Sequence, residues 1–191
     1  MKDKKRIYFF LFSAGIFAFF LSCASNADIK EERSYIWITD SSKYTLLPPE
    51  NIKNPLDNYQ LVSASYGNVN YQMNSWVRAD KTGIDMTFLN ELGANMGELS
   101  WRGGAVSFSS SVFPQNLNPH YIIADFQLCF YDAGALVKIL KESGLSFKET
   151  ETSRYVYNGD AVIIEITKEK NIIRFVNHLR GYAYTLEGDF Q

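Results

Sequence analysis

Residues 69–88 read VNYQMNSWVRADKTGIDMTF, and both halves of this stretch alternate apolar with polar side chains. Tyr71 and Met73 alternate with asparagine and glutamine in the first half, and Met86 and Phe88 alternate with polar residues in the second. A period of two is typical of a strand with one buried face, and the Asp-Lys-Thr-Gly sequence between the halves supplies a turn. The stretch therefore predicts an antiparallel hairpin with these four side chains on its inner face.

The same pattern continues on the C-terminal side of this hairpin. A second hairpin is predicted over residues 99–108, with Trp101 and Phe108 on its apolar face, because Gly103-Gly104 provides the positive φ of a tight turn. The charged segment 168–171 is expected to be a turn between two later strands. Those later strands are predicted over residues 155–157, 161–167, 172–176 and 182–186.

Residues 119–143, PHYIIADFQLCFYDAGALVKILKES, interrupt the alternation with a crowded apolar run. Asp132 is suited to cap a helix that carries Leu136 and Leu140 on one face, and Gly144 is suited to end it. One antiparallel sheet that curves around this helical insert is the simplest way to bury both apolar sets. The expected fold class is therefore mainly β with a helical insert.

The composition is that of a folded domain. The chain has 191 residues, of which 46% are hydrophobic and 21% charged, so disorder and a coiled coil are excluded. Residues 23–191 carry 15 basic and 20 acidic side chains without a concentrated basic face, which argues against nucleic-acid binding. Two cysteines and two histidines are too few for most metal sites, and no cofactor is expected.

The N-terminus resembles a lipoprotein signal peptide. A basic cluster at residues 2–6 precedes an uncharged run over residues 7–22, which is shorter than the roughly 20 residues that span a bilayer as a helix. The run ends in Phe20-Leu21-Ser22-Cys23, which resembles the lipobox of bacterial lipoproteins. Residues 1–22 are therefore expected to be removed and Cys23 to be acylated. The alternatives are an ordinary signal cleaved near Cys23 and an uncleaved anchor.

A polar tether is expected to follow the lipid. Residues 24–34 are polar and charged, and residues 35–39 are either a first short strand or an arm that lies on the body. The sequence Tyr44–Pro49, YTLLPP, then ends in paired prolines, which cannot continue a strand ladder. We therefore expect a signal peptide at 1–22, a lipid-anchored tether at 23–43 and one domain at 44–191.

Three motifs together resemble a known family. They are Tyr44-x-Leu46-Leu47-Pro48-Pro49, Phe88-Leu89-x-x-Leu92-Gly93 and Ile123-Ala124-Asp125-Phe126-Gln127-Leu128-x-Phe130-Tyr131. They resemble DUF3261, a family of bacterial lipoproteins of uncharacterised function, over most of residues 44–187. That family is in turn distantly similar to LolB, the outer-membrane lipoprotein receptor.

The resemblance implies an incomplete antiparallel β-barrel of the LolB and LolA type, with a helical lid over an apolar cavity. In LolB-like proteins the cavity takes the acyl chains of a lipoprotein from a periplasmic carrier, and an apolar loop helps insert them into the outer membrane. The implied partners are acyl chains such as palmitate, membrane lipid and a periplasmic lipoprotein carrier, and the protein is expected to be a monomer. The implied location is the periplasmic face of the outer membrane. The Asp-x-Gln helix and the Pro-Pro segment depart from LolB, so lipoprotein transfer does not follow from the resemblance alone.

Leu92 is the candidate membrane-insertion residue. Residues 89–97, LNELGANMG, interrupt two strands and place Leu92 beside a glycine, which resembles the LolB loop that presents a leucine to the membrane. The alternative is that Leu92 folds back onto the core. Glu91 disfavours insertion, because a carboxylate is costly in lipid.

Two polar residues stand out in the apolar run of the insert. An unpaired carboxylate or amide is costly in such surroundings. Asp125 and Gln127 are therefore expected to form structural hydrogen bonds to the backbone at the start or hinge of the lid. Cys129 lies in the same run and is expected to be a small buried side chain.

The expected ligand cavity is lined by the inward apolar side chains of the sheet and the lid. These residues are Tyr71, Met73, Met86, Phe88, Trp101, Phe108, Phe126 and Phe130. Flexible methionines suit a pocket that adapts to chains of different length, and they suit a solid core equally well. The sequence predicts a lipid-anchored carrier or acceptor of acyl cargo, and the alternative is a structural lipoprotein with a filled core.

An acyl-processing enzyme is disfavoured. Ser109–Ser111, His120 and Asp125 can be combined into a triad only on paper, because neither a nucleophile-elbow motif nor a Gly-rich oxyanion loop accompanies them. No catalytic residue and no metal ligand is assigned.

Overall fold

Two antiparallel sheets form within residues 34–190, the part of the chain that the computed structural model describes. The smaller sheet is a hairpin of β1 (Tyr35–Trp37) and β2 (Lys43–Thr45). Of the two alternatives for residues 35–39, a short strand is therefore correct. The expected signal peptide and Cys23 lie outside the described residues.

The larger sheet has ten strands in the order β7-β6-β5-β4-β3-β12-β11-β10-β9-β8. Its first half is a meander of β3 (Leu56–Tyr66), β4 (Val69–Asp80), β5 (Gly83–Leu89), β6 (Asn95–Arg102) and β7 (Ala105–Ser109). Its second half is a meander of β8 (Ser146–Glu149), β9 (Ser153–Asn158), β10 (Ala161–Glu169), β11 (Ile172–Asn177) and β12 (Tyr182–Gly188). β3 pairs with β12 and joins the halves, whereas β7 and β8 are the two edges. Within residues 34–190 the sheet therefore does not close into a barrel.

Both predicted hairpins are present. Val77 faces Met86 across β4 and β5, and Leu99 faces Phe108 across β6 and β7. Residues directly opposite each other share a face of the sheet. The four side chains expected on the inner face of the first hairpin therefore do share one face. The Gly103-Gly104 turn has φ values of 55° and 81°, as the second hairpin requires.

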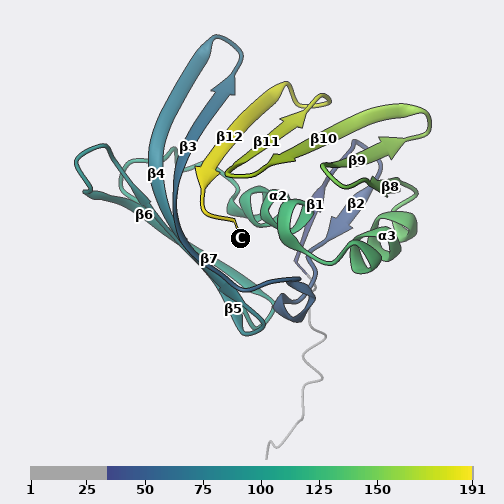
Figure 1. Cartoon of the computed structure of the whole chain (residues 1–191), viewed down its shortest axis with the longest axis horizontal. Helices are drawn as coiled ribbons and strands as arrows, with labels where there is room; N and C mark the ends of the chain where they lie inside the picture. The colour runs from purple at the N-terminus through teal and green to yellow at the C-terminus, as the bar shows by residue number, and fades with distance from the viewer. Residues whose placement is uncertain (1–33, 191) are drawn as a thin grey trace, which may run out of the picture. The chain divides into compact units, whose positions relative to one another are not determined.

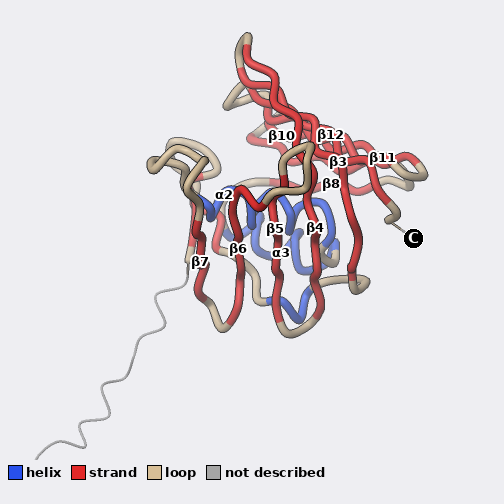
Figure 2. The backbone as a smooth tube through the Cα atoms, turned by 90° about the vertical axis from the view of Figure 1, so that its left-hand side faces the viewer, coloured by secondary structure: helices blue, strands red, loops and turns tan. Residues whose placement is uncertain are grey.

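The helical insert consists of two helices on the concave side of the large sheet (Figure 1, Figure 2). α2 (Pro119–Phe130) begins after Asn118, whose side chain accepts a hydrogen bond from the first turn. α3 (Ala133–Glu142) begins after Asp132, which caps it as predicted. Gly144 follows α3 with a φ of 76°. Among residues 34–190, no helix is long and apolar enough to cross a membrane.

The remaining segments close around the insert. β1 contacts α2, and β2 contacts α3. Between β2 and β3, the 3-10 helix η2 (Pro49–Asn51) leads to a bridge between Ile52 and Tyr131, the residue that follows α2. The core between the sheet and the helices is well filled. Fully buried side chains include Trp101, Tyr44, Tyr131, Phe175, Leu128 and Leu136.

The later strands are longer than the sequence predicts, and one strand was not predicted. β10 continues through Lys168 and Glu169, which were expected in a turn, because these residues pair with the start of β11. β8 was not predicted, because its sequence SFKE holds one apolar residue and shows no alternation.

Candidate functional site

α2 runs along the concave side of the sheet and is buried on all sides. Every residue from Ile123 to Cys129 is buried. A helix buried all round keeps its polar side chains only where each has a specific partner. Asp125, Gln127 and the carbonyl groups at the C-terminal end of α2 therefore each need a partner.

Gln127 holds the Tyr44–Pro49 segment against α2. Its Oε1 accepts hydrogen bonds from the Tyr44 hydroxyl at 3.0 Å and from the Leu47 N–H at 2.9 Å. Its Nε2 donates to the Leu47 carbonyl at 2.8 Å, and Trp101 Nε1 donates to the same carbonyl at 3.2 Å. The expected backbone hydrogen bonds of Gln127 exist, but they go to a segment 80 residues earlier rather than to the hinge of the insert.

Asp125 links α2 to the sheet. Its carboxyl accepts a hydrogen bond of 2.8 Å from the Tyr182 hydroxyl of β12, so this partner is a side chain of the sheet and not the backbone. Burial raises the pKa of Asp125 to about 8, and the hydrogen bond from Tyr182 and the charge of Arg180 only partly oppose this rise. At neutral pH the carboxyl is therefore mostly protonated, and the link is uncharged.

Two cations meet at the C-terminal end of α2. Arg154 Nη1 donates to the carbonyls of Leu128 at 2.9 Å and Cys129 at 3.1 Å. Lys168 Nζ donates to the same Cys129 carbonyl at 2.6 Å. Cations at this end of a helix satisfy its last carbonyl groups and oppose its dipole, so both side chains stabilise the end of α2.

The charges of these two cations are balanced differently. Arg154 is 2% exposed and pairs with Glu149, whose Oε1 lies 2.7 Å from Nη2. Within residues 34–190, Lys168 forms no ion pair with a carboxylate. Burial, together with the neighbouring charge of Arg154, lowers the pKa of Lys168 to about 8.

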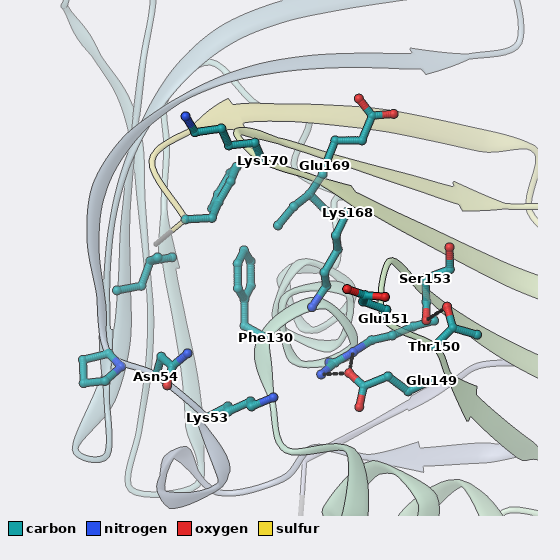
Figure 3. Close-up of a pocket in the computed structure, with 15 residues that line it drawn as sticks. Lys53, Asn54, Phe130, Glu149, Thr150, Glu151, Ser153, Lys168, Glu169 and Lys170 are labelled. Atoms are coloured by element: carbon teal, nitrogen blue, oxygen red, sulfur yellow. Dashed lines mark hydrogen bonds and ion pairs between the residues drawn. The ribbon is translucent and has the colours of Figure 1, made fainter.

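A cleft of about 280 Å³ lies at this end of α2 (Figure 3). Its apolar lining residues include Leu56, Phe130, Ile173 and Phe190. The ring centroids of Phe130 and Phe190 are 5.9 Å apart, so the C-terminal tail packs against the end of α2. Lys53 follows η2 and donates its backbone N–H to the Phe130 carbonyl at 3.3 Å.

Charged residues also line the cleft. Lys53, Arg154, Lys168 and Lys170 line it together with Glu149, Glu151 and Glu169. Figure 3 shows the Lys168 ammonium beside the Phe130 side chain and the Lys53 side chain below it, extending toward Glu149, whereas Lys170 and Glu169 point away from Phe130. The cleft thus combines aromatic surface with ammonium groups, an arrangement that can hold an apolar chain with a polar head.

The family of the chain can be stated from a sequence comparison. The family model described as "protein of unknown function (DUF3261)" matches residues 57–188, which contain the large sheet from β3 onward and both helices. The chain belongs to DUF3261. A search of curated proteins finds no match. The residues that match DUF3261 include Phe130, Arg154 and Lys168 of the cleft. Lys53 and Phe190 lie just outside the matched range.

In this DUF3261 member, the eight residues expected to line a cavity are spread over three environments. Met86, Phe88, Trp101 and Phe126 are buried, Met73, Phe108 and Phe130 are half-buried, and Tyr71 is exposed. Phe88 and Phe108 pack edge to face with centroids 6.5 Å apart, and Phe126 packs on Phe130 at 4.7 Å. Of the eight, Phe130 lines the cleft at the end of α2.

Tyr71 differs from the inward position expected for it. It shares a strand face with Met73, yet it is 56% exposed. The reason is that β4 extends beyond β5, since the last pair between these strands is Asn74 with Leu89. Tyr71 instead lines a second, open cleft of about 440 Å³ with residues of β3, β11 and β12.

Leu92 lies at the tip of a well-bonded loop between β5 and β6. Asn90 Oδ1 accepts hydrogen bonds from the N–H groups of Leu92 at 3.0 Å and Ala94 at 2.9 Å, and the Asn90 carbonyl accepts one from Gly93 at 2.9 Å. Leu92 is 93% exposed. The predicted exposure of Leu92 is confirmed, and the alternative in which it folds onto the core is wrong.

The residues considered for a triad have separate local partners. His120 Nδ1 lies 2.9 Å from Asn118 Oδ1, and Ser110 Oγ donates to a backbone carbonyl of β6. Cys129 is fully buried as predicted, and burial raises the pKa of its thiol to about 12. Within residues 34–190, no group of three or more metal-ligating side chains lies together.

The charged residues of the cleft were not singled out from the sequence, although two of them carry a signal. Arg154 precedes Val156 by two positions, and Lys168 follows Ile164 and Ile166 with the same period. Each cation therefore continues the inward face of a strand. A cation at an inward position indicates either a carbonyl-rich partner or a binding site.

Proposed function

We propose that this DUF3261 member is a lipid-anchored binding protein of the bacterial cell envelope. It accepts an acyl chain or a similar apolar cargo and passes it on at the periplasmic face of the outer membrane, without a catalytic step. Acylated Cys23 provides the anchor, and a periplasmic lipoprotein carrier is a fitting donor. The observation that carries the proposal is the cleft at the end of α2, where aromatic side chains border a space of about 280 Å³.

Transfer of cargo requires binding that is favourable and reversible. Burial of a chain against Phe130 and Phe190 gains about 0.8 kcal/mol for each CH₂ group removed from water. A donor pocket, this cleft and a membrane offer similar surroundings to such a chain, so each transfer step is nearly balanced. Cargo then moves according to the relative affinity and amount of each site.

The resemblance to LolB that the sequence motifs suggest is a second support for the proposal. An open, curved antiparallel sheet with helices on its concave side is the arrangement that a half-barrel with a helical lid requires. In the proposal α2 and α3 act as the lid, and the ring pair of Phe130 and Phe190 marks where cargo enters. Leu92 is exposed on a rigid loop and serves as the membrane contact during delivery.

A structural lipoprotein is the second candidate, and one observation favours it. α2 is buried on all sides, and Met86, Phe88, Trp101 and Phe126 pack in the core. Such packing suits a rigid module that docks a partner in the cell envelope. This candidate differs from the first in leaving the cleft without acyl cargo.

Native mass spectrometry of the full-length protein, purified from cell envelopes, separates the two candidates. We expect non-covalent adducts with the mass of an acyl compound. Phe190→Asp should reduce them about tenfold, because a carboxylate on an apolar wall is costly. Val137→Asp is the matched control, since Val137 is exposed on α3. Adduct-free wild-type protein, even after incubation with lipid vesicles, would favour the structural lipoprotein.

A further inference from the structure

We infer that the cleft at the C-terminal end of α2 binds a single-chain amphiphile and places its anionic head, a carboxylate or a phosphate, between Lys53 and Lys168. The inference rests on the proposed function, in which the same cleft takes apolar cargo. It adds the chemistry of the head and the number of chains.

The first argument is the charge left over beside Phe130. Arg154 and Lys168 both donate to the Cys129 carbonyl, so two cations share one acceptor. Glu149 forms its ion pair with Arg154 and acts on Lys168 only at longer range, and within residues 34–190 neither Lys53 nor Lys168 has an ion-pair partner. An anion between the two ammonium groups supplies the missing charge.

The carboxylates around the cleft do not take this place. Glu149 is held by Arg154 through Oε1, which accepts from Nε at 2.8 Å. Glu169 points away from the Phe130 ring (Figure 3), and Glu151 is exposed in the turn between β8 and β9. Within residues 34–190 no carboxylate forms an ion pair with Lys53 or Lys168, so both ammonium groups are available to an external anion.

The second argument is the shape and size of the cleft. The Lys168 ammonium lies beside the Phe130 side chain (Figure 3), so an anion bound to it has aromatic surface next to it. A volume of about 280 Å³ is at the lower end of the range of ligand pockets. That volume suits one acyl chain and is small for a lipid with two or three chains.

Photolabelling tests the inference on the full-length protein in phosphatidylcholine vesicles. The probe is a fatty acid with a diazirine at the end of its chain, and mass spectrometry identifies the labelled residues. We expect labels at Phe130 or Phe190. Lys168→Gln should reduce labelling about tenfold and Lys53→Gln about threefold, as expected for a half-buried and an exposed charge. Lys138→Gln, exposed on α3, should leave it unchanged.

Lys53→Gln keeps the test informative if Lys168→Gln fails to fold, because the Lys53 side chain is exposed and does not cap α2. The methyl ester of the same probe retains the chain and removes the charge, and it should label about tenfold less. Equal labelling by acid and ester, or labelling by the acid that neither lysine variant reduces, would overturn the inference and leave acyl binding intact. Absence of labelling by both probes would overturn the proposed function as well.

Competition identifies the source of the anionic head. Unlabelled dodecanoate and monododecyl phosphate should both displace the probe. The one that displaces it at the lower concentration shows which head group the cleft prefers. Inorganic phosphate that displaces the probe at the same concentration would overturn the claim that the ligand is an amphiphile.

Discussion

Polar groups in the middle of α2 differ in charge balance from those at its C-terminal end. In the middle, Gln127 and Asp125 are buried among partners that match them, and both links are uncharged at neutral pH. At the end, Arg154 and Lys168 both donate to one carbonyl, and of these two cations only Arg154 forms an ion pair with a carboxylate. A buried polar side chain alone therefore does not indicate a binding site. A buried polar group that is hydrogen-bonded holds the fold together, whereas a buried charge without a counterion beside a cleft is available to bind an anion.

The largest effect is expected at the matched network. Gln127→Leu keeps the side-chain volume but removes three buried hydrogen bonds. They join Gln127 to the Leu47 N–H, the Leu47 carbonyl and the Tyr44 hydroxyl. The free energy of unfolding should fall by about 4 kcal/mol, measured by urea unfolding followed through tryptophan fluorescence. Gln72→Leu on the exposed part of β4 is the control. A loss below about 1 kcal/mol would show that this network is not what fixes the Tyr44–Pro49 segment.

Asp125 should give a pH dependence of stability. Because the folded state keeps a proton up to pH about 8 and the unfolded carboxyl loses it near pH 4, stability is full below pH 4 and falls as pH rises toward 8. Between pH 4 and pH 6 the expected loss is on the order of 3 kcal/mol, since each pH unit in this range costs about 1.4 kcal/mol. Asp125→Asn should flatten this part of the profile while retaining an acceptor for Tyr182. An identical slope in both proteins would assign the proton to another group.

The unmatched end should instead give a pH dependence of binding. Lys168 has a pKa of about 8, shaped by burial, by the cations Arg154 and Lys53, and by the opposing effects of Cys129 and Glu149. Affinity for an anionic amphiphile should therefore decrease about fivefold between pH 7 and pH 9, as Lys168 loses its proton. The measurement is photolabelling across pH with the fatty-acid probe. Lys168→Gln should show a flat profile, and a wild-type profile as flat as that of the variant would exclude Lys168 as the contact.

The smallest effect on stability is expected at Leu92. Leu92→Glu should change the free energy of unfolding by less than about 0.5 kcal/mol, because the side chain is exposed. Transfer of acyl cargo to vesicles should nevertheless slow about threefold, since a carboxylate resists entering the interface. Leu92→Phe keeps the loop apolar and should transfer normally. Unchanged transfer by Leu92→Glu would remove this loop from the delivery step.

Local features of this molecule could be predicted from the sequence. Alternation and turn glycines defined the hairpins of β4–β5 and β6–β7, and Asp132 defined the start of α3, because each signal lies within a few residues of the structure it specifies. An exposed Leu92 followed from an interruption between two strands. The isolated Gln127 in an apolar run indicated a buried hydrogen-bonding role.

Features that depend on distant segments could not be predicted in the same way. The partner of Gln127 is 80 residues away, and nothing near either residue encodes that pairing. The cleft collects side chains from the loop before β3, the end of α2, the turn between β8 and β9, the end of β10 and the C-terminal tail. Strand order decides which of these segments meet, and strand order follows from the packing of the whole sheet rather than from any one period.

The ladder between β3 and β12 has a consequence for the kinetics of folding. Each meander grows from hairpins between strands that are consecutive in the sequence, whereas this ladder pairs Ser65 with Ala183, 118 positions apart. Closing a loop of that length is slow compared with forming a hairpin, so the two meanders form first and the ladder last. A chain that pauses between these steps presents β3 and β12 as two unpaired edges, and misassembly with a second chain competes with folding at those edges.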